Sequence, residues 1–444
     1  MGQVEKSASL RSAIPPRRRR AVVGGAIGTL MEYYDYYLYG LASATVFPAV
    51  FFPSESAVTG TLESFASFAF GFLLRPIGGL VFGDIGDRLG RKASLMITVI
   101  GMGLSTAAIG LIPSASSIGI AAPILLLTFR MLQGLFVGGE MGSAAALVVE
   151  HAPVGRRGLF GALLISGAGI ANVASAGFMA ALGTGSHSFF MTWGWRIPFV
   201  FALVLAVIAV ILRSKLEESD EFKEFSAKSK TKQTRRKFPL REVFRHPKNT
   251  ILGILIGLPQ SIAGYVVLTF GLAYMVSKGT EAQVGFIGTM IVGVLQIFAA
   301  PLWGSLSDKI GRRKLYIGAC ATFALLIYPV LALYSTEVAV LIWLGMVIGF
   351  VIPGVCMQGT LQTMLSEMFD VEARTTGVNI GYQISNTLGG GFAPLICVAL
   401  ATAAGSIWPV VVYVAVIALI GVVATAYASF RPDIAGAARL HEVA

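Results

Sequence analysis

Long apolar runs dominate the chain and alternate with short polar segments. Each run holds at least about 18 residues, which is enough for an α-helix to cross the hydrocarbon core of a bilayer. The runs are rich in glycine and lack the strict alternation of a membrane β-strand, so they favour helices over a β-barrel. Their approximate limits are 21–50, 59–82, 93–112, 119–150, 157–183, 196–213, 250–276, 284–304, 315–334, 338–365, 375–403 and 407–430. The pattern predicts an all-α polytopic membrane protein with twelve transmembrane helices.

Basic residues gather in every second loop between these runs. They occur before residue 21, in 84–92, at 156–157, through 213–248, in 309–314, at 374 and in the C-terminal tail. The only basic residue in the alternate loops is Lys278. This distribution predicts that both termini and the basic loops face the cytoplasm. The net charge of +11 is therefore spread along one membrane surface, and the expected partner is the lipid bilayer rather than nucleic acid.

One motif occurs twice, half a chain apart. The segment GDIGDRLGRK at 83–92 aligns with GSLSDKIGRRK at 304–314, with an offset of 221 residues. Repetition on this scale predicts two six-helix halves. The expected divisions are a basic N-terminus at 1–20, an N-terminal bundle at 21–213, a cytoplasmic linker at 214–249, a C-terminal bundle at 250–430 and a short tail at 431–444.

Each copy of the motif combines groups that suit a cytoplasmic gate. Glycines allow close helix approach, the aspartate can accept hydrogen bonds from the first amides of a neighbouring helix, and the basic residues remain at the surface. Arg75 on the second run and Glu140 on the fourth are expected at a similar depth near the cytoplasm, where a contact between them would form part of the gate. The alternative is that Arg75 snorkels to the interface. The candidate gating residues are Asp87, Arg88, Arg91, Asp308 and Arg312 from the motif, with Arg75 and Glu140 from the runs.

Three ionisable residues are expected near the bilayer midplane. At 1.5 Å per residue, Glu32 and Asp35 lie roughly 17 and 21 Å from the start of the first run, and Arg130 lies roughly 17 Å from the start of the fourth. Charges at this depth cost several kcal/mol and usually serve a function. The protonation of a buried carboxylate depends on its partner and its hydration. We therefore predict Asp35 as the proton-coupling residue, with Glu32 as the alternate.

The apolar runs of the second half carry uncharged polar groups at central depth, which suggests the neutral wall of a cavity whose charged wall is the first half. A buried arginine suits an anionic substrate because its planar fork binds a carboxylate through two hydrogen bonds. The candidate substrate-binding residues are Arg130, Tyr36, Tyr39, Gln133 and Asn172 in the first half, and Tyr265, Gln358, Tyr382, Gln383 and Asn386 in the second.

The loop motif resembles that of the major facilitator superfamily. EYYDYYLYG at 32–40, RMLQGLFVGGEMGSAA at 130–145, FLLRPIG at 72–78 and WGWRIPF at 193–199 narrow the resemblance to its metabolite:proton symporter family. Members of that family carry organic acids such as shikimate, 2-oxoglutarate and citrate, or proline and betaine, together with protons. The resemblance implies a bacterial inner-membrane symporter that imports a small hydroxy or keto mono- or dicarboxylate, driven by the proton gradient without a cofactor. A monomer is expected.

Two alternative transport functions remain open. One is symport of a zwitterionic osmolyte, and the other is efflux by an antiporter of the same fold, although the fifth run lacks the Gly-Pro motif common in efflux members. An enzyme is not expected, because the four histidines are scattered at 151, 187, 246 and 441 and form neither a metal site nor a catalytic cluster.

Overall fold

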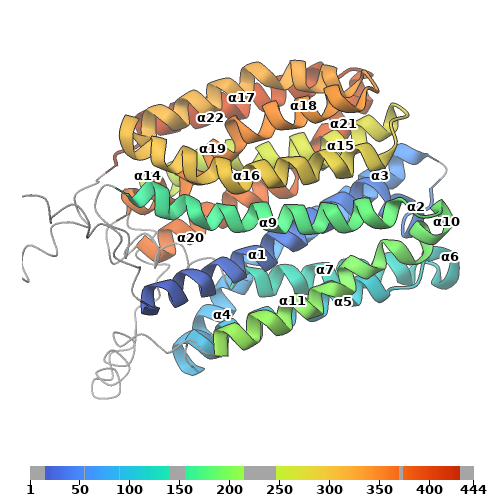
Figure 1. The fold of residues 1–444 in the computed structure, drawn as a ribbon, viewed down its shortest axis with the longest axis horizontal. Coiled ribbons are helices and arrows are strands. Elements are labelled where there is room, and N and C mark those ends of the chain that lie inside the picture. The colour runs from blue at the N-terminus through green and yellow to red at the C-terminus, as the bar shows by residue number, and fades with distance from the viewer. Residues whose placement is uncertain are drawn as a thin grey trace, which may run out of the picture.

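The chain folds into a bundle of roughly parallel and antiparallel helices (Figure 1). The structure, a computed structural model, describes residues 16–54, 56–89, 91–139, 156–214, 247–369 and 374–430. Within these ranges, eleven helical segments are long and apolar enough to cross a membrane. The twelfth is α1 (Pro16–Thr45), which is less apolar than the other eleven because it contains Glu32 and Asp35. The prediction of twelve transmembrane helices is confirmed.

Helices of the first half lie together on one side of the bundle, in blue to green in Figure 1. After α1 they are α2 (Phe47–Val50), α3 (Ala57–Leu73), α4 (Arg75–Leu89), α5 (Arg91–Leu111), α6 (Ala115–Ile118), α7 (Ala121–Gly138), α9 (Arg157–Gly183), α10 (His187–Phe189), η1 (Phe190–Gly194) and α11 (Arg196–Ser214). The second span is interrupted at Leu74, between α3 and α4. The fourth predicted run extended to residue 150, whereas α7 ends at Gly138 and residues 140–155 lie outside the described ranges.

The second half occupies the other side, in yellow to red in Figure 1. Its elements are α14 (Pro247–Gly264), η2 (Tyr265–Phe270), α15 (Gly271–Ser277), α16 (Ala282–Ile310), α17 (Arg312–Tyr334), α18 (Ala339–Met346), η3 (Val347–Val351), α19 (Pro353–Met368), α20 (Arg374–Ser385), η4 (Asn386–Gly391), α21 (Ala393–Ala404) and α22 (Trp408–Tyr427). The elements labelled η are π-helical turns that continue the neighbouring α-helices. The predicted linker lies almost entirely outside the described residues.

The two halves meet along α9 and α16, which run side by side (Figure 1). Glycines face each other across this contact: a Cβ on Gly169 would lie 2.9 Å from the carbonyl oxygen of Gly293. Polar bonds also cross it, from Ser166 to the carbonyl of Ile297 at 3.0 Å and from Gln283 to the carbonyl of Ala180 at 2.8 Å. Small residues permit the close backbone approach that membrane helices need, because lipid supplies no hydrophobic force between them.

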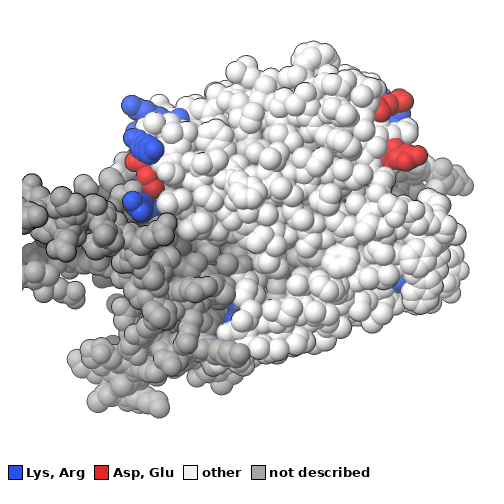
Figure 2. Space-filling view, viewed as in Figure 1, with Lys and Arg blue, Asp and Glu red and all other residues white. Residues whose placement is uncertain are grey.

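The lateral surface is apolar, as a bilayer requires. Figure 2 shows one lateral face that is almost free of charge, with Lys, Arg, Asp and Glu at the two ends of the bundle. Large side chains such as Leu325 and Leu302 are 76% and 69% exposed there. We call the end where α1 begins and α16 finishes the basic end, and the other the opposite end.

We predict that the basic end faces the cytoplasm. Ser186 and Ser214 are both exposed and lie at the two ends of one span. Ser186→Cys should react in intact cells with a thiol reagent that does not cross the membrane, whereas Ser214→Cys should react only after permeabilisation. The three native cysteines are buried, so the unmodified chain is the background control. The reverse labelling pattern would refute this orientation.

Candidate functional site

Asp35 and Arg130 form a buried ion pair between α1 and α7. Nη1 of Arg130 lies 2.9 Å from Oδ2 of Asp35, and the side chains are 1% and 2% exposed. Oδ1 of Asp35 accepts a hydrogen bond from the hydroxyl of Thr106 on α5 at 3.1 Å and another from the amide of Gln133. That amide also donates to Thr106 at 2.7 Å. The cluster supplies the partners that a buried carboxylate needs to stay ionised.

Glu32 and Arg75 form a second buried pair, one turn earlier along α1. Their closest nitrogen and oxygen are 4.0 Å apart, and the hydroxyl of Tyr36 connects them. It donates a hydrogen bond to Oε1 of Glu32 and accepts one from Nη1 of Arg75. The guanidinium carbon of Arg75 lies 3.7 Å from the ring centre of Phe72 and 4.2 Å from that of Tyr36. Cation–π contacts of this kind help to stabilise a desolvated cation.

The position of Arg75 corrects a prediction from the sequence. It was expected near the cytoplasmic surface, beside Glu140 or snorkelling to the interface. Its side chain is 1% exposed and contacts Glu32 instead, so the expected depth and the snorkelling alternative are wrong; Glu140 lies outside the described residues. The cause is the length of the second span: the predicted run ended at residue 82, whereas α4 continues from Arg75 to Leu89, so Arg75 lies about 21 Å from the end of that helix. The carbonyl oxygen of Arg75 packs so closely on Gly138 that a Cβ there would collide with it.

Glycine contacts between helices bring both arginines close to α1. A Cβ on Gly134 of α7 would collide with the carbonyl oxygen of Gly71 on α3, and a Cβ on Gly71 would collide with Nε of Arg130. Only glycine permits backbones and side chains to approach this closely. The position of Arg130 beside Asp35 therefore depends on residues that have no side chain.

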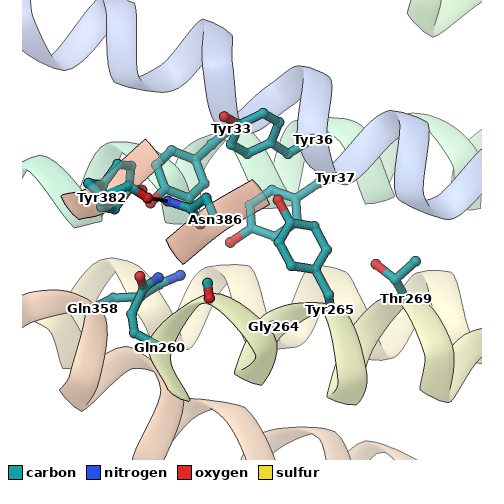
Figure 3. Close-up of a pocket in the computed structure, with 11 residues that line it drawn as sticks. Tyr33, Tyr36, Tyr37, Gln260, Gly264, Tyr265, Thr269, Gln358, Tyr382 and Asn386 are labelled. Carbon is teal, nitrogen blue, oxygen red and sulfur yellow. Dashed lines mark hydrogen bonds between the residues drawn. The ribbon is translucent and has the colours of Figure 1, made fainter. Parts of the chain in front are cut away.

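A small cavity lies between α1 and the second half (Figure 3). It encloses about 20 Å³, which is room for roughly one water molecule. Its lining residues are Tyr33, Tyr36, Tyr37, Gln260, Ser261, Gly264, Tyr265, Thr269, Gln358, Tyr382 and Asn386. None of these lining residues is Asp, Glu, Lys, Arg or His, so the cavity wall consists mainly of aromatic rings, hydroxyls and amides.

Two irregular helical turns shape the wall of the second half. The π-helical turn η2 begins at Tyr265 and η4 begins at Asn386, and both residues line the cavity. Such turns re-aim side chains and occur often at functional sites. Close by, Gln296 donates a hydrogen bond to Gln358 at 3.0 Å.

Half of the predicted substrate-binding residues line this cavity: Tyr36, Tyr265, Gln358, Tyr382 and Asn386. The other five, Arg130, Tyr39, Gln133, Asn172 and Gln383, are buried but not part of its lining. Arg130 and Gln133 are engaged with Asp35. Tyr39 contacts the hydroxyl of Ser67 at 2.8 Å. The side-chain amides of Asn172 and Gln383 have no hydrogen-bond partner among the described residues.

The sequence analysis named Tyr36 and Tyr39 on α1 as substrate-binding candidates, together with the carboxylates Glu32 and Asp35. Tyr36 lines the cavity, whereas Glu32, Asp35 and Tyr39 point toward α3, α4, α5 and α7 within their own half. Tyr33 and Tyr37 also line the cavity and were not among the candidates. The stripe that faces the second half contains Tyr33 and Tyr37 and is rotated by one residue, about 100°, from Glu32. The carboxylates of Glu32 and Asp35 point toward the arginines that pair with them. Tyr33 and Tyr37 occupy the face of α1 that remains.

Asp308 closes the basic end by joining the two halves. Its carboxylate accepts hydrogen bonds from the backbone N–H groups of Gly158 at 2.9 Å and Leu159 at 3.0 Å, in the first turn of α9. It also pairs with Arg312 at 2.9 Å, and Arg312 reaches Glu367 on α19 at 2.6 Å. A carboxylate is stabilised at a helix N-terminus by the unpaired amides and the helix dipole.

The corresponding motif of the first half is described only in part. The backbone there belongs to the end of α4 and the start of α5. The side chains of Asp87, Arg88 and Arg91 lie outside the described part of the chain, so their predicted gating role stays a prediction.

Contacts between the halves surround the cavity. Toward the basic end, the hydroxyls of Tyr33 and Tyr382 are 3.1 Å apart. Toward the opposite end, the rings of Phe68 and Tyr265 pack with centres 5.3 Å apart, and Thr387 donates a hydrogen bond to the carbonyl of Phe72 at 3.2 Å. The cavity between the halves has room for roughly one water molecule, so the halves must separate to admit a solute.

Comparison with known proteins identifies the family. Residues 21–223 match the profile of sugar (and other) transporters, and residues 254–439 match that of the Major Facilitator Superfamily. The chain is 38% identical to the shikimate transporter of Escherichia coli K12, over 88% of this chain and 90% of the relative. The chain belongs to the major facilitator superfamily. A proline/betaine transporter of Salmonella typhimurium is 34% identical, over 91% of this chain and 82% of the relative.

Solved structures agree with this superfamily fold. A crystal structure of a D-xylose-proton symporter superposes with a TM-score of 0.70 at 18% identity, covering 92% of this chain and 96% of that one. At this identity the likeness shows the fold, which is the twelve-helix major facilitator fold with two halves. Together with the relatives, it makes this chain a multi-pass membrane protein and a secondary transporter rather than an enzyme.

Proposed function

We propose that this major facilitator protein is a proton-coupled symporter that imports a small hydroxy or keto carboxylic acid by alternating access. The observation that carries the proposal is the buried Asp35–Arg130 pair on α1 and α7, on the same helix α1 that lines a cavity of neutral hydrogen-bonding groups with the second half. The proton gradient would drive uptake without a cofactor. A monomer in a bacterial inner membrane, with both termini in the cytoplasm, is the form we propose.

Proton coupling is supported by the chemistry of the ion pair. Protonation of Asp35 would leave the permanently charged Arg130 without its counter-ion in a buried site, which is costly. Nε and Nη2 of Arg130 have no hydrogen-bond partner among the described residues, so the guanidinium has donors to spare. A change of conformation that hydrates Arg130 or brings an anion to it would therefore be linked to protonation of Asp35.

The substrate class is supported by the cavity wall. Gln260, Gln358 and Asn386 contribute amides, and Ser261 and Thr269 contribute hydroxyls. Gln358, Asn386 and Ser261 already have partners within the protein, whereas Oε1 of Gln260 has none among the described residues. A hydroxylated solute can donate to Gln260, and a solute without donors leaves that oxygen buried and unpaired at a cost of about 1–3 kcal/mol. The similarity to a shikimate transporter agrees with this choice, since shikimate is a hydroxylated ring carboxylic acid.

A second candidate is a zwitterionic osmolyte. Tyr33, Tyr36, Tyr37, Tyr265 and Tyr382 surround the cavity, and aromatic rings attract quaternary ammonium groups. The similarity to proline/betaine transporters points the same way. The two candidates differ in whether the ligand needs hydroxyl groups.

Replacing Asp35 should separate proton-driven transport from exchange. Asp35→Asn mimics the protonated carboxyl, so accumulation of labelled acid driven by a pH gradient in proteoliposomes should fall to background. Counterflow of labelled for unlabelled acid should persist at least in part, because exchange requires no net release of a proton.

The matched control for this experiment is Arg130→Lys. Lysine keeps the charge but loses the planar fork, so accumulation and counterflow should fall together. If Asp35→Asn still accumulates the acid against its gradient with normal pH dependence, Asp35 is structural and the coupling proposal is wrong.

Competition for uptake should distinguish the substrate classes. Small hydroxy acids should inhibit uptake, while their amides and their deoxy analogues should inhibit at least about tenfold less. The amides lack the anion that an arginine would bind, and the deoxy analogues lack a donor for buried acceptors such as Oε1 of Gln260. Strong inhibition by betaine with none by hydroxy acids would reject the acid and favour the osmolyte.

A further inference from the structure

Two tyrosines of α1 lie under two buried arginines in matching geometry. The ring of Tyr39 lies 4.0 Å from the guanidinium carbon of Arg130, and the ring of Tyr36 lies 4.2 Å from that of Arg75. Both side chains are at most 3% exposed. They occupy neighbouring turns of one helix and differ in the partners of their hydroxyl groups and in their position relative to the cavity.

The two hydroxyls have different partners. That of Tyr39 contacts Ser67 at 2.8 Å, whereas that of Tyr36 lies between Glu32 and Arg75 and bonds to both. Tyr36 also lines the cavity, while Glu32 and Arg75 are not among its lining residues. Tyr36 thus touches the space where a solute would bind and the charge pair behind it. Figure 3 shows its ring beside those of Tyr33 and Tyr37 on the cavity wall.

A phenol hydroxyl has a single proton to donate. In this structure Tyr36 donates it to Glu32. A carboxylate or hydroxyl of a solute in the cavity would compete for the same proton. An ionised Glu32 holds the hydroxyl more strongly than a protonated one, because hydrogen bonds to charged acceptors are roughly twice as strong as those between neutral groups.

We propose that Tyr36 is a positioning residue through which the protonation state of Glu32 sets the affinity for an anionic substrate. When Glu32 is protonated, Tyr36 turns its hydroxyl to the substrate, and the charge of Arg75 is available to the anion through the shared hydroxyl. When Glu32 is ionised, it retains both Tyr36 and Arg75. The inference rests on the proposed symport of an acid, and it assigns Glu32 to affinity and Asp35 to coupling.

Other titratable groups lie near Glu32 and interact with its charge. They are Arg75 on α4, Tyr382 on α20, and Tyr33 and Tyr36 on α1 itself. Asp35 lies one turn away and has its own cation in Arg130. Of this set, Tyr36 is the residue with a hydroxyl that bonds to Glu32 and a ring that lines the cavity.

The test compares the KM for uptake as a function of pH in the wild type and three variants. In the wild type, KM should rise with pH as Glu32 ionises. Tyr36→Phe keeps the ring over Arg75 but removes the hydroxyl, so KM should be about tenfold higher or more at low pH and should no longer depend on pH. Glu32→Gln should keep the low KM of the acidic range at every pH. The double variant should match Tyr36→Phe alone, because the two residues act as one unit.

Tyr39→Phe is the matched comparison. The fold-change in KM caused by Tyr39→Phe should multiply with the fold-change caused by Glu32→Gln. The reason is that the hydroxyl of Tyr39 bonds to Ser67 rather than to Glu32. Independent effects of Tyr36→Phe and Glu32→Gln, or a normal pH dependence of KM in either, would overturn the inference. If Tyr36→Phe does not reach the membrane, a KM that still rises with pH in Glu32→Gln overturns the inference. Failure of the symport proposal itself is recognised separately, because Asp35→Asn would then accumulate the acid normally.

Discussion

A charge in the interior of a membrane protein must be paired, and this constraint organises the first half of the transporter. Asp35 and Arg130 satisfy each other at 2.9 Å, with Thr106 and Gln133 completing the hydrogen bonds of the carboxylate. Because the pair is costly to separate in a low dielectric, a proton on Asp35 and the release of Arg130 are linked events. A transporter needs such a link to tie a proton gradient to a change of conformation.

The geometry of the pair depends in turn on helix packing. Gly71 and Gly134 allow α3 and α7 to touch backbone to backbone, and the side chain of Arg130 packs against Gly71 next to Asp35. The same crossing places Arg75 beside Glu32. Two carboxylates on one helix thereby acquire two separate cations, and only the Glu32 pair is connected to the cavity, through Tyr36. Proton coupling and substrate affinity can then reside in different carboxylates of α1.

Much of the fold could be predicted because it follows from one-dimensional rules. The fifth apolar run, 157–183, coincides with α9, and the depth of Asp35 and Arg130 follows from the helical rise alone. The rotation of α1 could not be predicted, since the face given to Tyr33 and Tyr37 depends on where the cations of other helices lie. The depth of Arg75 was missed because the second span continues as a helix to Leu89, beyond the point where its apolar run ends.

Proton uptake by the purified transporter tests the central claim most directly. The transported acid is added to detergent-solubilised protein in weakly buffered solution, and the change in pH is recorded for the wild type and for Asp35→Asn. The account predicts that the variant takes up about one proton fewer per bound substrate than the wild type. Equal proton uptake by the two proteins would contradict the assignment of Asp35 as the coupling carboxylate.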